Sequence, residues 1–124
     1  MDQASFVAVA QLIPDIEEDL RYATAENFTG AVIYSFRRAW LRRGTAEKLA
    51  RAQARLKELG YRLKLWDAFR PLEAQYRMWE VCPDDDYVAD PTRGGCSNHN
   101  RGSAVDVTLV TLAGQPVTMP TEFD

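Results

Sequence analysis

The residues best suited to chemistry in this chain lie within residues 97–106, whose sequence is SNHNRGSAVD. The segment contains His99, the only histidine of the chain, and ends on Asp106 at the head of an apolar stretch. An imidazole and a carboxylate are both common ligands of divalent metal ions, and Gly102 between them permits a tight backbone turn. We therefore predict that His99 and Asp106 hold one metal ion from two directions.

The residues alone leave other interpretations of this segment open. An isolated histidine is more often a structural, hydrogen-bonded side chain than a ligand. A buried carboxylate at Asp106 needs a cation or several donors, which favours the metal. Cys96 is either a further ligand or an ordinary loop thiol. A triad of His99 with Ser97 or Ser103 is disfavoured, because the segment has no nucleophile-elbow pattern.

The sequence predicts a helix followed by a strand in the middle of the chain. Thr45 is a good N-cap for a helix over residues 46–59, in which apolar residues recur at helical spacing, and Gly60 supplies the stop. Directly afterwards Leu63 and Leu65 alternate with basic residues, which is typical of a half-buried strand. The pattern predicts a helix followed closely by a strand.

A second helix is predicted over residues 71–81, because proline suits the first helical turn and ends the preceding extended segment. Its inward side chains are expected to be Ala74, Met78 and Val81. Residues 6–12 have the composition of a short strand.

The firmest strand prediction begins at Asp106. Val105, Val107 and Leu109 alternate with more polar positions there, so Asp106 is expected to project from the face opposite the valines. Together these elements predict an α+β domain.

Composition narrows the function classes. The 124 residues fit a single domain, and 46% hydrophobic with 27% charged residues is ordinary for a globular protein. A formal net charge of −3, with 15 basic residues scattered among 18 acidic ones, predicts no nucleic-acid partner.

The chain has no long apolar run and no leader-like N-terminus, so we expect no membrane association and a cytoplasmic location, or a periplasmic one if a signal peptide was removed. Cys82 and Cys96 are expected to be free thiols.

Three segments carry a resemblance to a known family. Residues 97–109 (SNHNRGSAVDVTL) resemble the zinc-binding segment of the VanX-type D-alanyl-D-alanine dipeptidases, in the wider LAS superfamily of zinc metallopeptidases related to the Hedgehog N-terminal domain. Residues 19–24 (DLRYAT) and 27–30 (NFTG) together resemble the N-terminal signature of that family, and residues 65–71 (LWDAFRP) resemble its arginine-bearing strand end. The matches occur in the family's order over nearly the whole chain.

The resemblance implies a fold and an activity. The fold would be the Hedgehog/DD-peptidase type of α+β domain, a small, mainly antiparallel sheet with helices packed on it. The activity would be zinc-dependent hydrolysis of the dipeptide D-alanyl-D-alanine, a precursor of the bacterial cell wall. The biological role implied is either resistance to vancomycin or recycling of the dipeptide as a nutrient.

The resemblance also implies roles for single residues. His99 and Asp106 would be two of three zinc ligands, and Arg70 would stabilise the oxyanion formed at the scissile carbonyl, although an arginine taken alone is more often part of a surface salt bridge. Tyr22, Ser97 and Asp124 would line the pocket for the free amino end of the dipeptide. Asp67 would support the strand end that carries Arg70, or contact the substrate directly.

One part of the family pattern has no counterpart in residues 1–124. The family's third ligand and catalytic base lie in a Glu-x-x-His motif, and Glu122 is followed by no histidine. We expect these 124 residues to form the N-terminal two-thirds of the domain, completed by a C-terminal fragment or a second chain. The alternatives are a peptidoglycan D,D-carboxypeptidase or endopeptidase of the same superfamily, and an inactive, truncated metal-binding module.

Overall fold

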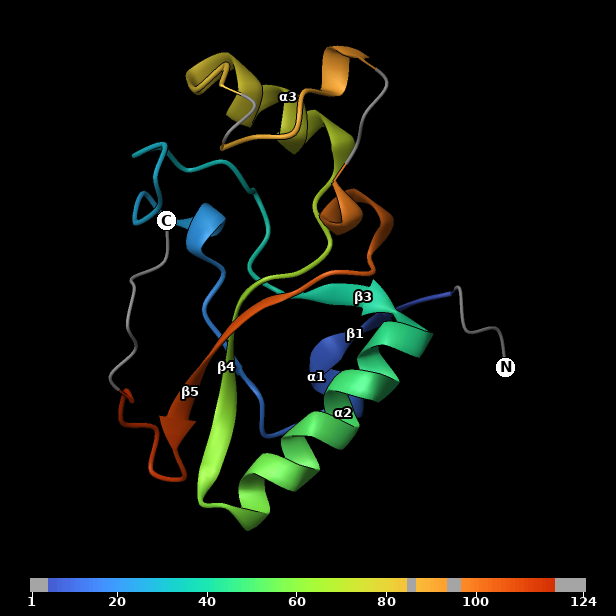
Figure 1. Ribbon diagram of the computed structural model, residues 1–124, viewed down its shortest axis with the longest axis vertical. Helices are drawn as coiled ribbons and strands as arrows, with labels where there is room; N and C mark the ends of the chain where they lie inside the picture. Colours follow the sequence, from blue (N-terminus) through green and yellow to red (C-terminus); the bar gives the residue numbers. More distant parts are fainter. Residues whose placement is uncertain (1–4, 85–86, 94–96, 118–124) are drawn as a thin grey trace.

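Strand β4 is the centre of the architecture in the computed structural model, which describes residues 5–84, 87–93 and 97–117. It pairs on one side with β2 in parallel and on the other with β5 in antiparallel orientation, while β1 and β3 form a separate antiparallel pair. Figure 1 shows β4 and β5 side by side, with α2 beside the lower part of the molecule and α3 at the opposite end.

The α+β fold with a small, mainly antiparallel sheet is therefore confirmed. The strands are β1 (Phe6–Ala8), β2 (Glu17–Glu18), β3 (Trp40–Arg42), β4 (Tyr61–Asp67) and β5 (Asp106–Thr111); the helices are α1 (Val9–Leu12), α2 (Arg43–Glu58) and α3 (Leu72–Val81), with short 3-10 helices η1 (Arg21–Ala23), η2 (Pro91–Arg93) and η3 (Asn98–Arg101).

The first predicted helix is present as α2, but it begins earlier than expected. Its N-cap is Arg42, the last residue of β3, so the prediction of Thr45 as the N-cap is wrong. The reason lies in tertiary structure: the backbone N–H of Arg43, at the first turn, donates to the carbonyl of Ser5 over 2.7 Å. Gly60 follows the helix with φ of +90°, as expected for a glycine stop.

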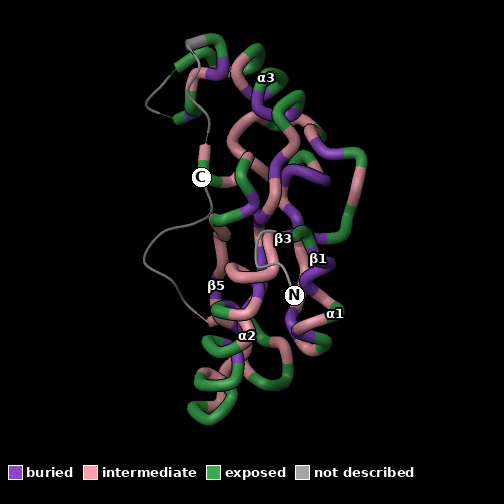
Figure 2. The backbone as a smooth tube through the Cα atoms, turned by 90° about the vertical axis from the view of Figure 1, so that its right-hand side faces the viewer, coloured by how far each residue is buried: buried purple, intermediate pink, exposed green. Residues whose placement is uncertain are grey.

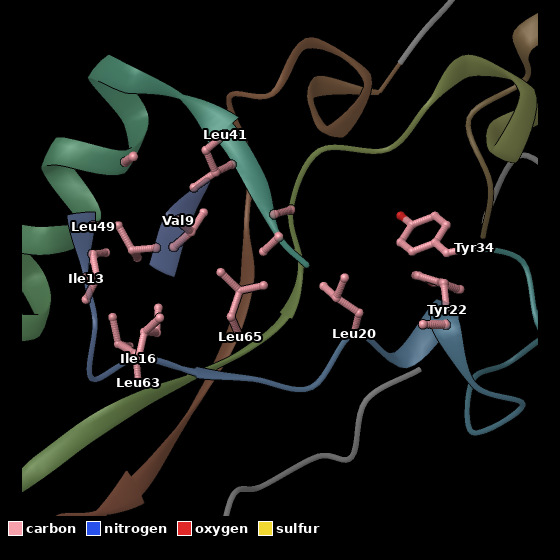
Figure 3. Close-up of a cluster of buried hydrophobic side chains, with 14 of the residues drawn as sticks. Val9, Ile13, Ile16, Leu20, Tyr22, Tyr34, Leu41, Leu49, Leu63 and Leu65 are labelled. Carbon is pink, nitrogen blue, oxygen red and sulfur yellow. The ribbon is translucent and has the colours of Figure 1, made fainter. Parts of the chain in front are cut away.

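The core lies between α2 and the inner face of β4. Leu63 and Leu65 are 4% and 0% exposed, which confirms the predicted alternation of this strand. Figure 3 shows them grouped with aliphatic side chains of the N-terminal segment, β3 and α2, while Leu20, Tyr22 and Tyr34 occupy the other end of the cluster. In Figure 2 the outer turns of α2 are exposed. The labelled aliphatic neighbours are Val9, Ile13, Ile16, Leu41 and Leu49.

The second predicted helix is present as α3, directly after Pro71. Ala74 and Met78 are buried as expected, but Val81 is 47% exposed, so its predicted inward position is wrong. Val81 is the last residue of the helix, and the backbone leaves helical geometry at the C-cap Cys82, whose φ is −139°. The buried face includes Gln75 instead, which is fully buried.

The N-terminal strand is shorter than the predicted range 6–12. Only Phe6–Ala8 forms β1, because its partner β3 has only three residues, and the chain then turns into α1. The backbone N–H of Val9 donates to the carbonyl of Ala39 at this point.

Among the residues described, Cys82 is a free thiol. None of the described helices has the length and apolar character needed to cross a bilayer.

Candidate active site

A β-bulge brings two carboxylates together where β4 ends and β5 begins. Leu65 faces Val107 across the ladder, but the next paired position joins Asp67 to Asp106, because Trp66 is an extra residue in β4. With regular pairing, Asp106 would face Trp66 and point away from Asp67. The bulge therefore places Asp67 and Asp106 at the same end of the sheet.

Helix η3 presents His99 to these carboxylates. The Ser97 hydroxyl accepts a hydrogen bond from the His99 backbone N–H over 3.1 Å, and the Asn100 side chain accepts one from the Ser97 N–H over 2.9 Å, which forms a capping box. Gly102 ends the helix with φ of +72°, and a Cβ there would collide with the Phe6 ring. The predicted tight turn at Gly102 is confirmed.

The hydrogen bonds of the His99 ring leave one nitrogen for a ligand. Its Nδ1 lies 2.9 Å from the carbonyl oxygen of Ala68, and because a carbonyl only accepts, Nδ1 carries the hydrogen. In the neutral ring Nε2 then has its lone pair free, 3.5 Å from Asp106 Oδ2. This is the arrangement in which a histidine binds a metal through Nε2.

The exposure of Asp106 differs from the expectation. Its side chain is 45% exposed, so the prediction of a buried carboxylate at this position is wrong. Asp106 lies at the first residue of its strand, where the other side of the carboxylate faces solvent. The buried carboxylate is Asp67, which is 0% exposed and lies 3.6 Å from His99 Nδ1.

Arg70 lies beside this group and is itself buried, with 6% exposure. Its Nη2 donates to Asp67 Oδ2 over 2.7 Å, its Nη1 donates to Gln75 Oε1 over 2.7 Å, and its Nε donates to the Tyr34 hydroxyl over 3.3 Å. The Tyr34 hydroxyl in turn donates to Asp67 Oδ1 over 2.6 Å. The ring of Tyr22 lies 5.3 Å from the guanidinium carbon.

These contacts keep Arg70 charged. Burial alone would lower the pKa of its guanidinium, but the adjacent Asp67 outweighs that effect and the pKa is raised. Burial raises the pKa of the Asp67 carboxyl, an effect that Arg70, His99 and the Tyr34 hydrogen bond oppose. The buried pair is thus held by mutual attraction and by hydrogen bonds on the remaining oxygen.

The pKa of the His99 imidazole is also shifted. Burial lowers it, but the hydrogen bond to Asp106 and the charge of Asp67 raise it, and the net pKa lies above the ordinary 6.5. A metal cation bound at Nε2 would replace the proton that Nε2 carries in the imidazolium form, because the same negatively charged surroundings stabilise the proton and the metal cation.

The donor set fits a divalent metal ion. Asp67, His99 and Asp106 each offer a ligand atom, and these atoms lie within 4.8 Å of one another. Asp67 already accepts from Arg70, Tyr34 and the neighbouring backbone N–H, whereas the Asp106 carboxylate is half-exposed and the neutral His99 ring offers its Nε2 lone pair. His99 and Asp106 are therefore the two residues best placed to hold the ion.

Comparison with known proteins decides the family. The sequence profile of the D-ala-D-ala dipeptidase family matches residues 2–124. The chain belongs to this peptidase family. It is 40% identical over 123 residues to the D-alanyl-D-alanine dipeptidase of Escherichia coli (strain K12), covering 99% of this chain and 63% of that protein.

Two further relatives of the dipeptidase family carry the same name. The D-alanyl-D-alanine dipeptidase of Enterococcus faecalis is 32% identical over 96% of this chain and 68% of its own length. That of Streptomyces coelicolor is 34% identical over 86% of this chain and 62% of its own length. The chain thus spans a little under two thirds of the E. coli and S. coelicolor relatives, and slightly more of the E. faecalis one.

The structure describes only some of the other residues predicted for a dipeptidase-type site. Tyr22 is 4% exposed in η1 with its ring beside Arg70, and Ser97 is half-buried beside the backbone of His99. Asp124 and Cys96 lie outside the described residues. Asp67, His99, Asp106 and Arg70 come together.

Sequence reasoning missed two members of the arginine network. Gln75 lies on the face of α3 that also buries Ala74 and Met78, so a glutamine within an apolar stripe was a readable signal. Tyr34 lies in an irregular segment with no periodicity, and no local pattern marks it.

Proposed function

We propose that this protein hydrolyses D-alanyl-D-alanine with a zinc ion held by His99 and Asp106. The observation that carries the proposal is the juxtaposition of an available His99 Nε2 and the Asp106 carboxylate, 3.5 Å apart, beside a buried and permanently charged arginine. The family membership and the names of the relatives support the choice of substrate.

The zinc ion, Arg70 and Asp67 would each have a separate role in the proposed reaction. A zinc ion, when bound, supplies a positive charge that polarises the peptide carbonyl. Arg70 would donate to the same oxygen and stabilise the negative charge that develops there, a task that suits a planar donor with no deprotonated form. Asp67 would keep Arg70 charged and oriented, since its full burial favours this role over direct substrate contact.

The free amino end of the dipeptide would be bound by a pocket of polar groups. We assign this pocket to Tyr22, Ser97 and Asp124. An anionic group facing an ammonium would favour a dipeptide over a longer peptide, in which that nitrogen is an amide.

The third zinc ligand and the catalytic base would come from residues other than those of the site described above. His99 is the only histidine of the 124 residues, so a second imidazole ligand would belong to another segment or chain. We propose a Glu-x-x-His segment for both roles, on a C-terminal fragment or a second chain. The enzyme would act on cell-wall precursors, in resistance or in recycling, and we place it in the cytoplasm, or in the periplasm after signal removal.

Release of D-alanine from D-alanyl-D-alanine tests the proposal. We expect zinc-dependent release that stops with a chelator and returns with zinc, and intact-mass spectrometry of the same sample identifies every polypeptide present. Arg70→Ala should lower kcat about 10²- to 10³-fold while zinc content stays unchanged. Arg62→Ala is the matched control, because Arg62 donates to the Asp15 carbonyl at the far end of β4 and should retain activity.

The competing activities give different results in the same assay. Cleavage of an N-acetylated dipeptide or of intact muropeptides in preference to the free dipeptide would identify a carboxypeptidase or endopeptidase. Zinc binding without cleavage of any of these substrates would identify a non-catalytic metal module. Equal loss of zinc and of activity in Arg70→Ala would contradict the role assigned to Arg70.

A further inference from the structure

Gln75 is a fully buried amide to which the proposed function assigns no role. It projects from α3 with 0% exposure, and its Oε1 accepts from Arg70 Nη1 over 2.7 Å. Its Nε2 donates to the backbone carbonyl of Ala89 over 2.9 Å. The side chain thus bridges the arginine and the segment that follows α3.

The donors of Arg70 can be counted. A guanidinium has five N–H groups, of which one on Nε, one on Nη1 and one on Nη2 are engaged by Tyr34, Gln75 and Asp67. Within the part of the chain that the structure describes, one N–H on each terminal nitrogen has no protein acceptor and is left for a substrate oxygen. Gln75 and Asp67 hold the two terminal nitrogens, so together they determine the direction in which the remaining N–H groups point.

The orientation of the Gln75 amide is itself determined. The Ala89 carbonyl can only accept, which requires the NH₂ of Gln75 on that side and its oxygen toward Arg70. The reverse orientation would set donor against donor and acceptor against acceptor. The Ala89 segment is anchored in turn, because neighbouring Val88 is 2% exposed and Tyr76 donates to the Pro91 carbonyl over 3.2 Å.

We propose that Gln75 is a positioning residue that fixes the plane of the Arg70 guanidinium and couples it to residues 87–91. Asp67 supplies the compensating charge, while Gln75 supplies direction without adding a second negative charge that would compete with a substrate oxygen for Arg70. The consequence for catalysis rests on the proposed function, but the geometric claim does not.

Nuclear magnetic resonance of the arginine side chains tests the geometric claim. A guanidinium held at both terminal nitrogens rotates slowly about its Cζ–Nη bonds, so we expect separate, slowly exchanging Nη–H signals for Arg70 in the wild-type chain. Gln75→Met should average or remove them, because it removes the acceptor at Nη1. Gln75→Glu should retain them, because it keeps an acceptor there.

Gln53→Met is the matched control. Gln53 is also a buried helical glutamine, 2% exposed, which accepts from the Leu63 N–H over 2.7 Å and donates to Asp15 over 3.3 Å, away from Arg70. It should reduce stability while leaving the Arg70 signals unchanged. Unchanged Arg70 signals in folded Gln75→Met, or their loss in Gln53→Met or in Gln75→Glu, would overturn the proposal.

An activity measurement separates this inference from the proposed function. If the dipeptide is the substrate, Gln75→Met should lower kcat about tenfold or more with little change in KM, since misaligned donors weaken the transition state more than substrate binding. An unchanged kcat would overturn the catalytic part of the inference. A wild-type protein with ordered Arg70 signals but no hydrolysis would instead overturn the proposed function.

Discussion

Strand β4 contains two kinds of buried position with different surroundings: the aliphatic residues Leu63 and Leu65, here called its apolar end, and the last residue, Asp67, here called its polar end. Leu65 and Asp67 face the interior two residues apart and are both 0% exposed. Around Leu65 the neighbours are aliphatic, whereas around Asp67 they are Tyr34, Arg70 and His99. Apolar burial stabilises by about 1.5–3 kcal/mol per large side chain, while a buried charge costs free energy unless it is paired.

This difference separates the part of the molecule that stabilises the fold from the part to which we assign the proposed chemistry. The apolar end needs only side chains of suitable volume and tolerates several kinds of them. The polar end needs specific partners at hydrogen-bond distance. The bulge at Trp66 lies between the apolar end and the polar end of the strand. The comparison teaches that burial alone does not identify the core.

The largest effect is expected from breaking the charge pair. Asp67→Leu should lower the free energy of unfolding by about 3–5 kcal/mol, because it leaves the Arg70 charge buried without its partner. The measurement is urea unfolding of the metal-free chain. The double variant Asp67→Leu/Arg70→Met is the control and should recover most of the loss, because no unpaired charge remains. A loss that the double variant does not reduce would contradict the comparison.

Leu65→Ala should have a somewhat smaller effect on stability and a different effect on the site. We expect a loss of about 2–5 kcal/mol from the cavity that it leaves, by the same urea measurement. Zinc affinity, followed by calorimetry under conditions where the variant is folded, should stay close to wild type. A large drop in zinc affinity would show that the two ends are not separable.

The smallest effect concerns pH and should come from the polar end only. In the metal-free chain the folded pKa of His99 lies above its unfolded value of 6.5, so protonated His99 stabilises the fold. That contribution is fully present below 6.5 and is lost as the pH rises through the folded pKa. The stability difference between wild type and His99→Asn should therefore shrink as the pH rises above 6.5. A difference that grows with pH would contradict the sign.

The apolar end could be predicted well from the sequence. The alternation of Leu63 and Leu65 predicted β4, and Gly60 predicted the helix stop before it, because both depend on local periodicity and backbone preference. The start of α2 was mispredicted at Thr45, since a tertiary hydrogen bond to Ser5 determines it.

The polar end was predicted only in part. His99, Asp106 and Arg70 were identified through their motifs, but Tyr34 and Gln75 were missed as partners of Arg70, and Tyr34 lies 36 positions away in the chain. Tyr34 contacts Asp67 across 33 positions of the chain, and no local pattern encodes that contact. The bulge that joins Asp67 to Asp106 likewise depends on pairing between two strands.

Anomalous X-ray scattering at the zinc edge, from crystals of the chain grown with zinc, tests the central claim most directly. The claim is that the two carboxylates have different partners, Asp106 the metal and Asp67 the arginine. We expect a single strong peak about 2.0–2.2 Å from His99 Nε2 and from an Asp106 oxygen, with the Asp67–Arg70 contact retained. A zinc ion bound to Asp67, with Arg70 displaced, would contradict the account.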